Sequence, residues 1–131
     1  MLNREKTIYS IKNNKFVEYS GIIIQELPYT KKINLRIDPN NNDYKSYCGK
    51  ILNAILPTKP NTYSENQRLK IIWLGPDEWL ITDYIQSDDL HEKLRQAVGD
   101  KESSVTDVSE NRTIIRISGE KLFNLLAKFL V

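Results

Sequence analysis

The sequence contains one cysteine, Cys48, and one histidine, His91. A single cysteine excludes an internal disulfide and fits a reducing cytoplasm, which is the compartment we expect. With so few thiols and imidazoles, no Cys or His cluster of the kind that binds zinc can be assembled. No base lies near Cys48 in the sequence and no titratable partner lies near His91. We therefore expect a structural cysteine and a surface histidine.

Long apolar runs are also missing. No stretch approaches the roughly 20 apolar residues of a membrane helix, and the N-terminus lacks the apolar core of a signal peptide. There is no glycine-rich phosphate loop. The net charge is only +2 and both signs are mixed along the chain. These absences argue against nucleic-acid and membrane partners.

The composition is that of an ordinary globular protein. The chain has 131 residues, of which 40% are hydrophobic and 27% charged. That length suits one domain with a real core and leaves little room for a second. Residues 1–20 are polar and without clean periodicity, so we expect an N-terminal tail followed by a single domain over residues 21–131.

Hydrophobic periodicity predicts six strands and three helices. The strands fall in pairs, and each pair is followed by one helix. This order favours an α+β fold, with three helices against a mostly antiparallel sheet. The predicted strands are 21–26, 33–37, 69–74, 79–82, 105–109 and 112–118; the helices are 44–56 (ended by Pro57), one capped by Ser87 and ended by Gly99, and one capped by Ser118.

The most distinctive segment is a pair of tryptophans around a turn. Trp73 and Trp79 each lie in an apolar β-type run, and Gly75, Pro76 and Asp77 lie between them. Pro at the second turn position and Asp at the third are typical of a tight turn. We predict a hairpin with both tryptophans buried. Asp77 and the following Glu78 are adjacent carboxylates, but on a turn we expect them to be solvated and not to form an acid/base pair.

A second hairpin is predicted around Glu110-Asn111, because asparagine tolerates the positive φ of a two-residue turn. In that register Asp107 shares one face with Arg112 and Arg116, as diagonal neighbours. Two interpretations stay open. The three side chains form a surface ion-pair cluster worth about 0–1 kcal/mol, or they present a polar patch to a partner subunit.

The last helix ends on apolar residues. Phe129 and Leu130 lie near its end, with no glycine or polar cap after them. A frayed end is one explanation. We favour an interface with another polypeptide, because contiguous exposed apolar surface usually marks one.

Five separated motifs in one order resemble the gamma subunit family of heterotetrameric sarcosine oxidases. They are Asn34-Leu35-Arg36, Leu56-Pro57 with Pro60-Asn61-Thr62, Trp73 to Leu80, Asp107-Val108-Ser109 with Arg112-Thr113, and Ser118-Gly119. The last part, from strand through Ser-Gly to helix, also resembles the folate-binding domain of glycine-cleavage aminomethyltransferases. The resemblance therefore implies that fold.

The resemblance also implies a function. Such complexes oxidatively demethylate sarcosine, pass the one-carbon unit to tetrahydrofolate or release formaldehyde, and reduce oxygen to hydrogen peroxide. Flavins, NAD and tetrahydrofolate belong there to the alpha and beta subunits, and zinc to the delta subunit. The gamma subunit has no known cofactor and no assigned catalytic residue. For this chain we accordingly expect no catalytic, cofactor-binding or metal-binding residue.

Family members run on for some tens of residues past Val131, so we expect the chain to lack the family's C-terminal part. The alternatives are a folate-binding domain in one-carbon transfer, a gamma-type subunit for another N-methyl amino acid, and a free-standing interaction module. The candidate interface residues are Asp107, Arg112, Arg116, Phe129 and Leu130.

Overall fold

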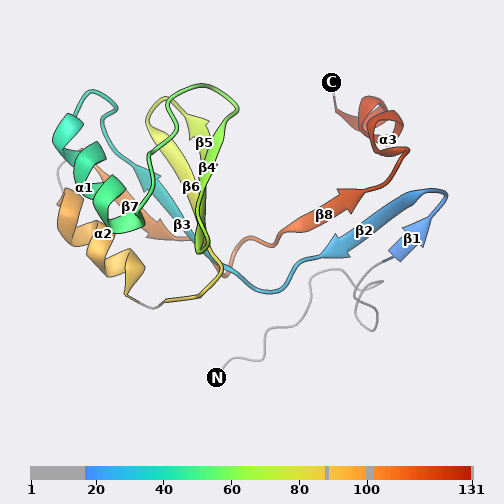
Figure 1. The fold of residues 1–131 in the computed structure, drawn as a ribbon, viewed down its shortest axis with the longest axis horizontal. Helices are drawn as coiled ribbons and strands as arrows, with labels where there is room; N and C mark the ends of the chain where they lie inside the picture. Colours follow the sequence, from blue (N-terminus) through green and yellow to red (C-terminus); the bar gives the residue numbers. More distant parts are fainter. Residues whose placement is uncertain (1–16, 88, 100–101, 131) are drawn as a thin grey trace. The chain divides into compact units, whose positions relative to one another are not determined.

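The structure, a computed structural model, describes residues 17–87, 89–99 and 102–130. The contacts divide the chain into two compact units (Figure 1). The central unit is the continuous segment Thr30–Arg112, and the terminal unit combines the chain's two ends, described over 17–29 and 113–130. The predicted domain over residues 21–131 thus contains the whole central unit and most of the described terminal unit. The expectation of a single domain over that span stays a prediction.

The central unit contains a five-stranded antiparallel sheet. Its strand order is β4-β5-β6-β3-β7. The strands are β3 (Lys31–Arg36), β4 (Tyr63–Glu65), β5 (Leu69–Gly75), β6 (Glu78–Asp83) and β7 (Ser104–Asp107). On β5 the buried residues Leu69 and Ile71 alternate with less buried ones, as the period of two requires when one face of a sheet packs on a core. On β3 four consecutive residues, 32–35, are buried.

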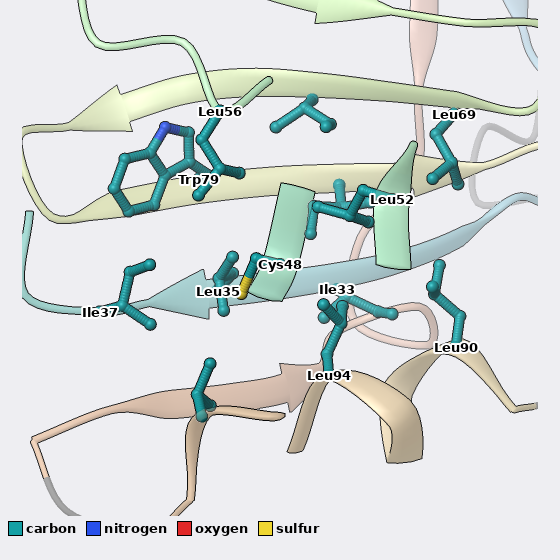
Figure 2. Packing of buried hydrophobic residues seen from close by; sticks show 13 residues of the cluster. Ile33, Leu35, Ile37, Cys48, Leu52, Leu56, Leu69, Trp79, Leu90 and Leu94 are labelled. Atoms are coloured by element: carbon teal, nitrogen blue, oxygen red, sulfur yellow. The ribbon is translucent and has the colours of Figure 1, made fainter. Parts of the chain in front are cut away.

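Two helices cover that face: α1 (Asn42–Leu52) and α2 (Leu90–Val98). Side chains from both helices join those of β3, β5 and β6 in one hydrophobic core (Figure 2). Leu35, Cys48, Ile71 and Leu94 have no exposed surface at all. The predicted α+β class, with three helices and antiparallel pairing, is confirmed over the described residues, although the strands form two sheets and not the single sheet that was predicted.

The tryptophan hairpin is also formed as predicted. Trp73 lies opposite Trp79 in the β5–β6 ladder. The register then shifts, so that Gly75 pairs with Glu78 and Leu74 is the extra residue of a β-bulge.

The terminal unit is smaller and has a different build. Its antiparallel sheet has the order β1-β2-β8, from β1 (Val17–Tyr19), β2 (Ile22–Glu26) and β8 (Ile115–Ser118), and α3 (Leu122–Phe129) follows. Gly119 follows β8 with a φ of +124°, and a Cβ atom there would lie 2.1 Å from the carbonyl oxygen of Gly21. Only glycine fits at this approach of two backbones.

Several predicted boundaries are wrong. The first helix ends at Leu52 and not at 56, because Asn53 adopts the left-handed conformation (φ +47°) and caps it. The N-cap of α2 is Asp89 and that of α3 is Lys121, in place of Ser87 and Ser118.

Two strands were not predicted. β1 lies in the expected tail, whose residues 1–16 are outside the described part of the chain. β4 lies between the predicted helix 44–56 and the predicted strand 69–74, where no strand was predicted.

The predicted hairpin over residues 105–118 is not formed. β7 pairs with β3, and β8 pairs with β2 in the other sheet. The physical reason is that β7 completes the open edge of β3, where Val105 packs against the core. That burial outweighs a local turn at Glu110-Asn111.

Candidate functional site

The two tryptophans have different environments. Trp79 is 1% exposed, and its indole Nε1–H donates to the carbonyl oxygen of Pro57 at 2.8 Å. Trp73 is only partly buried, so the prediction that both are core residues holds for Trp79 alone. The Nε1 of Trp73 is itself shielded from solvent and has no hydrogen-bond acceptor among the described residues.

The turn between the tryptophans is tied to the neighbouring strand. Arg36 Nη2 lies 2.9 Å from Asp77 Oδ2, and Asn34 Nδ2 donates to Glu78 Oε1 at 2.8 Å. The hydrogen bond and the negative charge of Asp77 raise the pKa of the Arg36 guanidinium. Two motifs quoted above, Asn34-Leu35-Arg36 and the tryptophan turn, therefore hold each other, and both carboxylates of the turn have structural partners.

Asp107 closes the end of β7 onto β3. Its Oδ1 accepts hydrogen bonds from the backbone N–H of Ser109 (2.9 Å) and from Ser109 Oγ (2.5 Å). Ser109 Oγ in turn accepts from the backbone N–H of Lys32 at 2.9 Å, and Val108 N–H donates to the Lys32 carbonyl at 2.9 Å. Burial raises the pKa of Asp107. The hydrogen bonds from Ser109 and the charges of the nearby Lys31 and His91 lower it by more than that, so the pKa of Asp107 lies below its usual value. We call this group of bonds the Lys32–Ser109 clasp.

Asp107, Arg112 and Arg116 do not share a hairpin face. Arg116 lies on β8 opposite Gln25, in the terminal sheet, whereas Asp107 lies opposite Ile33 in the central sheet. Arg112 is the last residue of the central unit. The geometric argument for a joint polar patch is therefore wrong, and a role for these residues at an interface stays a prediction.

A buried ion pair at the base of the tryptophan hairpin was missed by the sequence reasoning. The Asp83 side chain is 1% exposed and forms a two-pronged contact with Arg68, at 3.2 Å to Nε and 2.8 Å to Nη2. It also accepts from the backbone N–H groups of Ile85, Gln86 and Ser87. Burial raises the Asp83 pKa, but these bonds lower it more, so it stays ionised. The sequence did contain a signal for this ion pair, because Arg68 and Asp83 lie at the two ends of the predicted hairpin, away from its turn.

Cys48 and His91 offer no reactive centre. Burial raises the pKa of the Cys48 thiol to about 11, which keeps it protonated and poorly nucleophilic. His91 is partly buried, and its Nε2–H donates to the Val105 carbonyl at 2.9 Å, joining α2 to β7. The expectation of a plain surface histidine is therefore wrong, since the ring has a structural hydrogen bond. Within the described ranges no three His, Cys, Asp or Glu side chains gather as a metal ion would need.

The terminal unit has no fully buried large apolar side chain among its described residues, and several of them are exposed. Phe129 and Leu130, predicted at an interface, are 74% and 66% exposed, and Phe123 is 80% exposed. Helix α3 has no buried residue. A role of Phe129 and Leu130 at an interface stays a prediction. None of the described helices has the length and apolarity to cross a membrane.

Comparisons with known proteins agree on one family. The sequence pattern of the "Sarcosine oxidase, gamma subunit family" matches residues 36–130. The chain is 22% identical over 108 residues to a sarcosine oxidase subunit gamma from Corynebacterium sp. (strain U-96), covering 82% of this chain and 52% of that protein.

A solved structure of heterotetrameric sarcosine oxidase from Corynebacterium sp. U-96, in complex with pyrrole 2-carboxylate, contains a similar chain. Its TM-score is 0.73 with 23% identity, over 82% of this chain and 55% of that one, which shows the shared fold. The chain spans about half the length of the relatives it matches. Because the family pattern covers most of the chain, including the tryptophan turn at Asp77 and the segment around Ser109, this protein belongs to the sarcosine oxidase gamma subunit family.

Proposed function

We propose that this chain supports the assembly of a heterotetrameric sarcosine oxidase and performs no chemistry of its own. The observation that carries the proposal is the family match over residues 36–130, which extends through the central unit and into α3. The exposed apolar side chains of the terminal unit add support, because such surface on a small protein usually meets a partner.

The internal bonding of the acidic side chains is consistent with a structural role. Asp77, Glu78, Asp83 and Asp107 each bond to a neighbouring side chain. A general acid or base needs a proton-transfer position open to substrate. These carboxylates hold strands and turns together instead.

The partners we propose are alpha, beta and delta subunits, in the cytoplasm. Flavins, NAD, tetrahydrofolate and zinc would belong to those subunits. The complex would oxidise sarcosine or a related N-methyl amino acid. In this arrangement the chain affects turnover only through the integrity of the complex.

The test is to express the partner subunits from the same genome with and without this chain. We expect the full set to elute as one complex in size-exclusion chromatography and to produce hydrogen peroxide from sarcosine. Without the chain, the complex should dissociate or lose partners. An unchanged size and an unchanged rate in its absence would contradict the proposal.

A simpler measurement distinguishes the assembly role from the alternative of a folate-binding domain. The chain alone, titrated with tetrahydrofolate, should show no shift in its melting temperature. A saturable increase would instead favour a one-carbon transfer domain.

A further inference from the structure

A groove of about 690 Å³ runs along α1 and the loop that follows it. It belongs entirely to the central unit and lies outside the bonds described above. We call it the α1 groove; its lining includes Lys45, Gly49 and Lys50 from the helix, the capping residue Asn53, and Ile55 and Thr58 from the loop.

The α1 groove carries positive charge without compensation. Lys45 and Lys50 both line it, and none of its lining residues is acidic. Among the described residues, neither ammonium group has an ion-pair partner. Asp43 is two positions from Lys45, and residues so spaced on a helix do not face each other. An occupant with carboxylates is therefore favoured.

The apolar side chain of Ile55 also lines the α1 groove, and hydrogen bonds fix the backbone that carries it. Ile55 is 82% exposed, although the sequence pattern placed it on the buried face of a longer helix. Its carbonyl accepts from Ser64 Oγ at 2.6 Å, and the preceding Ala54 N–H donates to Gly49 O at 3.2 Å. The side-chain amide of Asn66 donates to the last carbonyls of the helix region at 2.9 and 3.2 Å.

The far end of the loop is fixed as well. Trp79 Nε1–H holds the carbonyl of Pro57, next to the lining residue Thr58. Gly49 allows the loop to return close to the helix, since a Cβ there would meet Ala54 O at 3.3 Å. Binding to a fixed surface loses little conformational entropy, so an exposed side chain held this way is suited to recognition.

We propose that the α1 groove is the docking surface for an acidic segment of a partner subunit. Its carboxylates would pair with Lys45 and Lys50, and an apolar side chain beside them would cover Ile55. The proposal rests on the proposed function. A polypeptide is favoured over a small molecule because Lys50 and Ile55 are exposed, whereas small-molecule sites enclose most of the ligand.

The test is co-purification of the partner subunits with the tagged chain. We expect wild type to retain them, and Lys45→Glu/Lys50→Glu and Ile55→Asp each to retain at least tenfold less. Arg95→Glu is the matched control, because it reverses an exposed cation in the last turn of α2, as Lys50 is in the last turn of α1. It should retain the partners as wild type does. Far-UV circular dichroism checks that each variant is folded.

Zero-length carbodiimide cross-linking of the wild-type complex gives a second readout that needs no variant. We expect Lys45 or Lys50 to be joined to an Asp or Glu of a partner subunit. Full retention by both groove variants, or cross-links at other lysines only, would overturn this inference and leave the proposed function intact. Cross-links between two copies of this chain would overturn the choice of occupant. A wild-type chain that retains no partner would overturn both proposals.

Discussion

The two units of this chain differ in what stabilises them. The central unit encloses a continuous core, with Leu35, Ile71 and Leu94 fully buried. The described residues of the terminal unit include none that is buried, and Phe123 is 80% exposed there. The difference teaches that stability is concentrated in the central unit, whereas the terminal unit has apolar surface available for an additional contact.

The largest effect should come from Trp79→Ala. Removal of a buried tryptophan side chain costs about 3–5 kcal/mol, because a cavity remains in the central core. Trp73→Ala should cost clearly less, since that ring is partly exposed. Urea unfolding of both variants measures the difference. Equal losses would show that the core includes both tryptophans alike.

Asp83→Asn should follow, with a loss of about 1.5–3 kcal/mol, the value of a hydrogen bond to a charged group. Asparagine keeps the size of the side chain but cannot accept the guanidinium of Arg68 through two oxygens. The same urea unfolding experiment applies. A variant as stable as wild type would show that the three backbone N–H donors alone hold the turn.

The same carboxylate predicts a pH dependence. The folded-state pKa of Asp83 lies below the unfolded value of about 3.9, so its contribution is fully present above that pH. The contribution is lost as the pH falls through the lower folded-state pKa. Wild type should therefore lose unfolding free energy more steeply than Asp83→Asn between about pH 5 and pH 2. Parallel curves would contradict this.

Arg36→Ala should have a smaller effect on the free energy of unfolding than Asp83→Asn, although it breaks the bond between two family motifs. Arg36 and Asp77 are roughly half exposed, with side-chain values of 53% and 45%, so water replaces the lost contact. Added salt should weaken the wild-type contribution further. A loss as large as that of Asp83→Asn would indicate that the motif is needed for the hairpin to form.

The smallest effect on stability is expected in the terminal unit. Phe123→Ser and Phe129→Ser should change the unfolding free energy of the isolated chain by about 0.5 kcal/mol or less, because both rings are already in water. The same variants should reduce co-purification with partner subunits. Arg95→Ala, at an exposed position of α2 outside the α1 groove, is a control that should change neither stability nor terminal-unit contacts. A large loss of stability in the serine variants would give the terminal unit a core after all.

Sequence reasoning succeeded where local chemistry determines the structure. The turn residues Pro76 and Asp77 between two β-rich runs were sufficient to predict the β5–β6 hairpin. The apolar stripe of Leu90, Leu94 and Val98 was sufficient for α2.

Prediction failed where long-range pairing decided between local options. Asn111 suits a tight turn, but β7 gained more from the edge of β3 than from its neighbour in sequence. Ile55 fits the helical period, yet the left-handed Asn53 ends the helix before it and leaves that side chain exposed. The Arg68–Asp83 pair and the α1 groove depend on such tertiary arrangements, so neither could be found from spacing alone.

The Lys32–Ser109 clasp has a consequence for the order in which the chain folds. The terminal sheet pairs Glu26 with Ile115, and next to that pair a side-chain hydrogen bond joins residues 87 positions apart, Glu26 and Thr113. The clasp joins residues 77 positions apart just inside that pairing. Once the central unit has folded and the clasp has formed, only a few residues separate Lys32 from β2, and only a few separate Ser109 from β8. The loop-closure entropy left for the terminal sheet is then lower by about 2 kcal/mol. Folding should therefore be sequential, and a stopped-flow experiment should show the Trp79 signal before protection of the β2–β8 amides.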